Sequence, residues 1–249
     1  MTQEVSPAAT LVIFRQPTGG PPELLMVERA KAMVFAGGAL VFPGGRIDPG
    51  DHALAATLGA PDDAAARIAA IRETIEEAGL AIGLDPLPAP AALATLRADL
   101  HAGVPFAVAL TAAGAALDLT LLHAFARWLP NHRTTRIFDA RFYLAALPEN
   151  APAATVDETE NVRLIWATAA DVLAAADAGR ATIIYPTRRN LERLAQYSTF
   201  ADAVADARAF PVRTITPHVE HRDGVPHLCI PDDLGYPVTA EAMDSAMRG

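Results

Sequence analysis

The stretch RETIEEAGL, residues 72–80, places three glutamates within five positions, directly before a glycine. At about 100° per residue, Glu73, Glu76 and Glu77 share one face of a helix. The opposite face carries an apolar stripe at helical spacing, made of Ile68, Ile71, Ile75 and Ala78. The pattern therefore predicts a helix over residues 61–78 that is buried by one face and carries a cluster of carboxylates on the other.

This cluster has an energetic cost. Like charges at these spacings cost about 0.2–0.5 kcal/mol per pair, and the helix dipole disfavours anions in the last turns before a C-terminal glycine. No lysine lies at i±4 to neutralise the cluster. One interpretation is an acidic face that is simply solvated. The other is a site for a hard divalent cation, since Mg²⁺ takes oxygen ligands and usually also holds substrate phosphates.

Composition narrows the class of protein. The chain has 249 residues, of which 51% are hydrophobic and 20% charged, which suits one sizeable globular domain with insertions. Its formal net charge of −9 and the lack of a basic run argue against a nucleic-acid partner. Cys229 is the one cysteine, and no stretch resembles a signal sequence or a membrane span. We therefore expect a cytoplasmic protein without a membrane partner.

The remaining pattern predicts a mixed sheet flanked by helices, because strands and helices alternate without a regular βαβ period. Strands are predicted at residues 8–14, 23–28, 39–43, 121–130, 138–148 and 162–167. Helices are predicted at residues 168–178 and 187–209, in addition to the glutamate helix. The segment GGRIDPGDH, residues 44–52, is predicted to be a loop, residues 84–118 a helical insertion, and residues 210–249 a C-terminal extension.

The glutamates follow FPGGRIDPGD, residues 42–51, and together these segments resemble the signature of the Nudix hydrolases. Gly45 matches the leading glycine of that signature, and Asp51 stands where its first glutamate is expected. The second half of the signature is matched by Arg72, Glu73, Glu76, Glu77, Gly79 and Leu80. Thr74 fills an apolar position. The chain departs from the signature by its longer spacing between Asp51 and Arg72, and the extra residues, about 52–64, are expected to form a loop or short helix.

The resemblance implies an α/β fold, a Nudix-type α/β/α sandwich with a mixed β-sheet, here as a single domain over residues 1–249. It implies hydrolysis of a pyrophosphate linkage in a small nucleotide-derived molecule, with Mg²⁺ or Mn²⁺ as cofactor. The lengthened signature resembles a subgroup that includes coenzyme A diphosphatases. ADP-ribose or NADH as substrate, a non-catalytic nucleotide-binding module and an acidic interaction helix remain alternatives. Residues 84–118 are further expected to serve substrate selectivity or a homodimer contact.

The resemblance also implies roles for the signature residues. Glu76 and Glu77 are expected to be metal ligands, and Glu73 either a metal ligand or the general base. Arg72 is expected to hold a glutamate in position, although an ordinary surface ion pair is the alternative. Gly45 turns the chain, and its carbonyl oxygen is a further candidate ligand. Among these, Glu73, Arg72 and Glu76 are the predicted catalytic residues.

Other candidates lie outside the signature. In this family a further acidic ligand commonly comes from a distant segment, and Glu160 is our first choice and Glu158 our second, against solvated loop acids as the alternative. Arg29, Arg136 and Arg141 are candidates for contacts with substrate phosphate, although each alone can be purely structural.

A zinc site is a competing hypothesis for the C-terminal extension, where four potential ligands lie close in sequence: His218, His221, His227 and Cys229. Their spacing matches no closed zinc set, and the segment instead has the pattern of a hairpin with an Asp-Gly turn. We therefore expect a hairpin there and not a zinc site.

Overall fold

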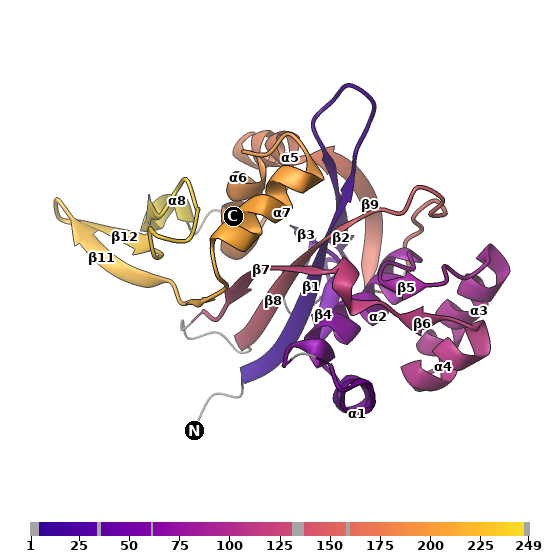
Figure 1. Cartoon of the computed structure of the whole chain (residues 1–249). Coiled ribbons are helices and arrows are strands. Elements are labelled where there is room, and N and C mark those ends of the chain that lie inside the picture. Colours follow the sequence, from indigo (N-terminus) through magenta and orange to yellow (C-terminus); the bar gives the residue numbers. More distant parts are fainter. Residues whose placement is uncertain (1–4, 34–35, 61, 131–136, 158–159, 247–249) are drawn as a thin grey trace.

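The structure is a computed structural model that describes residues 5–33, 36–60, 62–130, 137–157 and 160–246 (Figure 1). Its centre is an eight-stranded mixed sheet in which β10, β7, β8, β1, β2 and β3 follow one another, while β4 also pairs with β1 and β9 with β2. The strands are β1 (Val5–Arg15), β2 (Glu23–Arg29), β3 (Leu40–Val41), β4 (Gly44–Arg46), β7 (His123–Trp128), β8 (Ile137–Ala146), β9 (Asn161–Thr168) and β10 (Thr214–Ile215). The strands β1 and β8 run parallel, whereas β1 with β2 and β7 with β8 run antiparallel.

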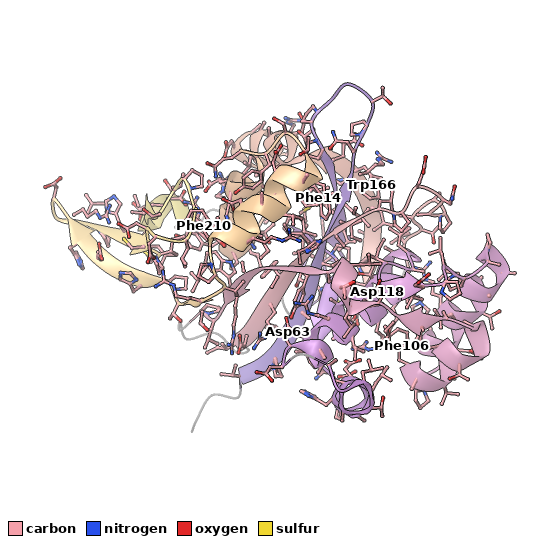
Figure 2. All side chains as sticks on the ribbon, viewed as in Figure 1. Phe14, Asp63, Phe106, Asp118, Trp166 and Phe210 are labelled. Atoms are coloured by element: carbon pink, nitrogen blue, oxygen red, sulfur yellow. The ribbon has the colours of Figure 1, made fainter. Side chains whose placement is uncertain are left out.

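Helices cover both faces of this sheet, so the predicted α/β/α sandwich with a mixed sheet is confirmed. One face packs against α2 (Ala64–Ala78), α3 (Pro90–His101) and α4 (Phe106–Ala113), with α1 (Pro49–Leu58) beside α2. The other face packs against α5 (Ala169–Asp177), α6 (Tyr185–Leu194) and α7 (Phe200–Ala209). In Figure 2, Phe106 of α4 and Phe210 just beyond α7 mark the two sides.

The strand β1 shows how the sequence creates two cores. Its odd-numbered residues Ala9, Leu11 and Ile13 face α2, whereas Val12 and Phe14 face the helices of the other layer. Both sets are almost fully buried, because alternate residues of a strand point to opposite faces and this strand is covered on both.

The glutamate helix forms as predicted, as α2. Its apolar stripe, made of Ile68, Ile71, Ile75 and Ala78, is completely buried. Gly79 ends the helix in the left-handed conformation at φ 66°, and its N–H donates to the carbonyl oxygen of Ile75 at 3.0 Å. The helix thus has its carboxylates fixed on the face that the core does not use.

Two segments differ from prediction. Residues 44–52 are not a loop, because they contain β4 and the first turn of α1, where Pro49 occupies the first helical turn after Asp48. The predicted helix over residues 187–209 is two helices, α6 and α7, and α7 starts afresh at Thr199, whose hydroxyl accepts from the Asp202 N–H at 3.1 Å.

The insertion and the extension have small sheets of their own. The insertion joins α3 and α4 to a two-stranded sheet of β5 (Leu84–Asp85) and β6 (Ala116–Leu117), followed by the short helix η1 (Leu119–Leu121). The extension forms a sheet of β11 (His218–Arg222), β12 (Val225–Cys229) and β13 (Ala240–Ala242), with the short helix α8 (Met243–Ala246). The hairpin β11–β12 turns at Asp223-Gly224, as predicted. Within the described ranges, no helix combines the length and apolar character needed to cross a membrane.

Candidate active site

The glutamates lie in the last two turns of α2, beside the short strand β4. A methyl group at Gly44 would overlap the carbonyl oxygen of Ala9, so only glycine lets β4 lie this close to β1. The Gly44 N–H donates to Glu77 Oε2 at 2.9 Å and so joins β4 to the helix. The glycine pair of the sequence motif therefore positions a carboxylate as well as turning the chain.

Glu77 is the most deeply buried of the three glutamates, with 5% of its surface exposed. Its Oε1 accepts from the Asn161 side-chain amide at 3.0 Å, so both carboxylate oxygens are held by N–H donors. Burial raises the pKa of Glu77 to about 7, although the hydrogen bonds from Asn161 and Gly44 and the positive charge of Arg29 oppose that rise. A cation placed beside this carboxylate would relieve the cost of its buried charge.

Arg72 connects the helix to the segment before it. Its Nε and Nη2 donate to both oxygens of Asp51 at 3.1 and 2.9 Å, and Nη2 also donates to the Arg46 carbonyl oxygen at 3.0 Å. Its Nη1 donates to Oε1 of Glu73 at 2.9 Å and to Oε1 of Glu76 at 3.0 Å. Burial opposes the charge of Arg72, but its bonds to Asp51 and the nearby acids raise its pKa above the ordinary value. These hydrogen bonds support the prediction that Arg72 holds glutamates of the motif in position.

Glu73 lies directly against Gly45. A methyl group at Gly45 would overlap the Glu73 carboxylate, so the carboxylate can pack here only against a glycine. Burial raises the pKa of Glu73 to about 8, with Arg72 lowering it and the charges of Glu77 and Glu76 raising it further. The side chains of Glu73 and Glu76 are 17% and 23% exposed, so both remain accessible from solvent.

Asp51 is a buried partner of Arg72. It lies in the first turn of α1, is 1% exposed, and accepts from the Asp48 N–H at 2.8 Å as well as from Arg72. Its oxygens are therefore engaged in holding Arg72 and starting α1. The pattern Asp48-Pro49-x-Asp51, with an acid three residues after a helix start, was the sequence signal for this arrangement.

Asn161 reaches the Glu77 carboxylate from outside the motif and was not among the residues predicted from the sequence. Asn161 is fully buried and donates to Glu77, whereas the side chain of Glu160 is 59% exposed and lies 3.7 Å from Arg29. Glu158 lies outside the described residues. The carboxylate of Asp157 accepts from the backbone N–H groups of Glu160 and Asn161 and so shapes the start of β9.

Of the three candidate arginines, the structure brings Arg29 to the glutamates. Arg29 ends β2, its charge acts on Glu77, and its buried Nε has no hydrogen-bond partner among the described residues. Arg141 instead acts on Asp63, which is labelled in Figure 2 and lies at the start of α2. At about 1.5 Å of rise per residue, Asp63 is about 20 Å from Glu77 along the helix. Arg136 lies outside the described residues.

The three glutamates of α2 provide the oxygen donors that a divalent cation would need. Among the described residues, no three His, Cys, Asp or Glu side chains are gathered as a ready ligand set. The chemistry nevertheless fits a hard cation, because three carboxylates share one helix end and burial raises the pKa of two of them. Arg72 holds Glu73 and Glu76 through Oε1 of each, so a bound cation would share these carboxylates with Arg72.

The histidines of the extension lie elsewhere, on the exposed β11–β12 hairpin. His218 Nε2 lies 3.0 Å from Glu220 Oε1, and His227 Nδ1 lies 3.0 Å from the carbonyl oxygen of Val225. Cys229 is buried and is a free thiol. These contacts are local to the hairpin and do not involve the glutamate helix.

The fold and the site thus define an α/β/α sandwich protein with an acidic helix end beside a glycine-rich strand. Residues 52–194 match the family of the NUDT19 Nudix domain, and this range contains all of α2. The chain belongs to the Nudix hydrolase family and is a Nudix pyrophosphohydrolase.

The chain is also similar to several solved structures. A Nudix hydrolase from Alicyclobacillus acidocaldarius is 29% identical with a TM-score of 0.72, and the match covers 82% of this chain and 97% of that one. A MutT protein from Methanosarcina mazei Go1 is 14% identical with a TM-score of 0.45 and coverages of 79% and 96%. An Ap4A hydrolase from C. elegans, in a binary complex, is 17% identical with a TM-score of 0.39 and coverages of 82% and 96%.

Proposed function

We propose that this chain hydrolyses the pyrophosphate linkage of a small nucleotide-derived substrate with the help of Mg²⁺ or Mn²⁺. The observation that carries the proposal is the end of α2, where burial raises the pKa of Glu73 and of Glu77 beside a third carboxylate. Groups whose pKa is perturbed in this way gather at functional sites. A purely solvated acidic face would have no reason to bury Glu77 and to leave the Glu73 side chain only 17% exposed.

Each residue then has a role in this reaction. Glu76 and Glu77 would hold the cation with the Gly45 carbonyl oxygen, and Glu73 would be a further ligand or the general base. When bound, the cation supplies charge neutralisation of the phosphates and a lowered pKa for water. Arg72 keeps Glu73 and Glu76 in position, because it donates to both from a buried ion pair.

The residues around Glu77 extend this assignment. Asn161 holds Glu77 by its side-chain amide. We therefore assign to Asn161 the role of positioning Glu77 from outside the motif, where Glu160 was predicted as a metal ligand. Arg29 is the best candidate for a phosphate contact, since its guanidinium lies near Glu77 and its Nε has no partner in the described part of the chain. Glu160, beside Arg29, would then pair with that arginine when no substrate is bound.

Coenzyme A or an acyl-coenzyme A is the first candidate substrate. Support comes from the lengthened motif, whose extra residues form most of α1. ADP-ribose and NADH are the next candidates, because fold alone does not select a substrate. We place the reaction in the cytoplasm, in keeping with the free thiol of Cys229.

The test is a substrate panel incubated with Mg²⁺ or Mn²⁺, with the products identified by mass spectrometry. Cleavage of coenzyme A should give adenosine 3′,5′-bisphosphate and 4′-phosphopantetheine, and the Glu77→Gln variant should give much less of both. A wild-type protein that cleaves no member of the panel with either metal would overturn the proposal.

A non-catalytic nucleotide-binding module is the second candidate. It is favoured by the ion pairs that Arg72 makes with Glu73 and Glu76, because these already engage one oxygen of each carboxylate. The same panel separates the two functions. Substrate binding by calorimetry without any product would support the module, whereas metal-dependent product would exclude it.

A further inference from the structure

We propose that Arg97, which the helical insertion supplies, is a positioning residue that fixes the glutamate-bearing end of α2. The inference rests on the proposed function, because it assigns the insertion a part in aligning the metal-binding carboxylates. The insertion was expected to serve substrate selection or dimer contact. Its contacts with α2 give it a different and more direct role.

Arg97 donates to the backbone of the two glutamates at the end of the helix. Its Nε donates to the carbonyl oxygen of Glu76 at 2.9 Å and its Nη2 to that of Glu77 at 3.3 Å. The last four carbonyl groups of a helix have no partner within the helix, and a cation beside them is favoured by the helix dipole. Arg97 therefore satisfies and stabilises the helix end at which three carboxylates would otherwise be disfavoured.

The same guanidinium holds the segment that leads to Asn161. Its Nη1 donates to Thr155 Oγ1 at 2.7 Å and its Nη2 to the Thr155 carbonyl oxygen at 2.9 Å. The Thr155 N–H in turn donates to the carbonyl oxygen of Ala78 at 2.9 Å. Asn161, six residues after Thr155 in the chain, donates to Glu77. Arg97 thus joins the backbone of Glu76 and Glu77 to Thr155, so one guanidinium connects the glutamate end of α2 to a second segment.

Packing fixes the position from which Arg97 reaches. Three leucines of α3, Leu93, Leu96 and Leu100, are buried in the same core as the apolar stripe of α2. The close fit extends to Gly79, where an added methyl group would lie only 3.0 Å from Arg97 Nη1. Because three buried leucines fix α3 in the core, the position of Arg97 along the end of α2 is fixed as well, which a flexible loop would not achieve.

The test compares wild type with Arg97→Ala and Arg97→Lys, and uses Arg188→Ala as the matched control. Arg188 also connects two helices, by an ion pair with Asp177 at 2.7 Å, but it lies in the opposite layer. Lysine keeps the charge of Arg97 and loses the planar fork that reaches two segments at once. Hydrogen–deuterium exchange of residues 73–80 is measured without metal, and the Mn²⁺ concentration for half-maximal activity is measured with the best substrate of the panel.

We expect exchange at residues 73–80 to become about tenfold faster in Arg97→Ala and the half-saturating Mn²⁺ concentration to rise about tenfold, the lower end of the effect of removing residues that support metal ligands. Arg97→Lys should lie between this variant and wild type, and Arg188→Ala should match wild type in both measurements. Unchanged exchange in both Arg97 variants would overturn the inference. Faster exchange with an unchanged Mn²⁺ requirement would also overturn it, because Arg97 would then be merely structural. If wild type itself binds no Mn²⁺ or cleaves no substrate, the proposed function fails, while the exchange data still decide whether Arg97 fixes the helix end.

Discussion

Replacing Glu77 by glutamine should lower activity and leave the metal-free protein as stable as before, or more so. In the folded chain, burial raises the pKa of Glu77 from 4.5 to about 7. At 1.36 kcal/mol per pKa unit, ionising this group in the folded state costs about 3 kcal/mol at pH 8. Glutamine has no charge to bury, so the Glu77→Gln variant avoids this cost.

The substitution also has a cost of its own. Both oxygens of Glu77 accept from N–H groups, those of Gly44 and Asn161, so the amide NH₂ of a glutamine must face one of these donors. An unsatisfied buried donor costs about 1–3 kcal/mol. The two effects together predict a metal-free variant that is between equal and about 2 kcal/mol more stable than wild type at pH 8.

Catalysis should change in the opposite direction. Removal of one main electrostatic contributor costs about 2–5 kcal/mol of transition-state stabilisation, which corresponds to a loss of about 30-fold to 5000-fold in kcat/KM. The assays are urea unfolding at pH 8, with EDTA and with Mn²⁺, and product formation on the substrate panel. Glu192→Gln is the matched control, because Glu192 is a largely buried carboxylate that pairs with Arg189 in the other layer. A rate within threefold of wild type, or a loss of stability above about 2 kcal/mol, would refute the reasoning.

Three further predictions follow from the same geometry. Because the pKa values of Glu73 and Glu77 are raised to about 8 and about 7, their contribution to stability is present below the unfolded-state value of 4.5 and is lost as pH rises through 7 and 8. Urea unfolding in EDTA should show this decline, and saturating Mn²⁺ should suppress it. Asp51→Asn should destabilise the protein by about 3–5 kcal/mol in urea unfolding, because it leaves the buried charge of Arg72 without its main partner. Gly45→Ala should lower kcat by about 100-fold in the product assay, because its methyl group displaces the Glu73 carboxylate.

Each of these three predictions can be contradicted by a control variant or by a measured profile. Gly50→Ala is the control for Gly45→Ala, because nothing lies within 4 Å of a methyl group at Gly50. Equal activities of the two variants would show that catalysis does not depend on the close packing of the Glu73 carboxylate against Gly45. A stability profile with EDTA that is flat between pH 5 and 8.5 would contradict the raised pKa values. An Asp51→Asn variant as stable as wild type would show that Arg72 has enough other partners.

The helix α2 could be predicted from sequence because two local signals agree in it. An apolar stripe and a terminal glycine are both encoded within 15 residues, and neither depends on distant parts of the chain. The segment 44–52 was predicted wrongly because glycine and proline were taken as signs of a loop. Here Gly44 permits close packing of β4 on β1, and Pro49 starts a helix, so both residues serve regular structure.

The contacts of the site were less predictable, because they depend on which residue of a strand points inward. A shift of one residue at the start of β9 would exchange Asn161 for Glu160, and no local signal fixes that register. The difference matters for the chemistry. Glu160 in that position would add a negative charge and raise the pKa of Glu77 further, whereas the Asn161 amide donates a hydrogen bond that favours the ionised form.

Two other neighbours of Glu77 also favour its ionised form. Gly44 donates to its second oxygen, and the charge of Arg29 acts on it from the end of β2. All three groups oppose the effect of burial, which alone would keep the carboxylate protonated near neutral pH. Burial still raises the pKa of Glu77 to about 7, so a cation beside this carboxylate would add to the groups that favour its ionised form. The arrangement around Glu77 therefore supports a metal-binding role more strongly than the three glutamates of the motif do by themselves.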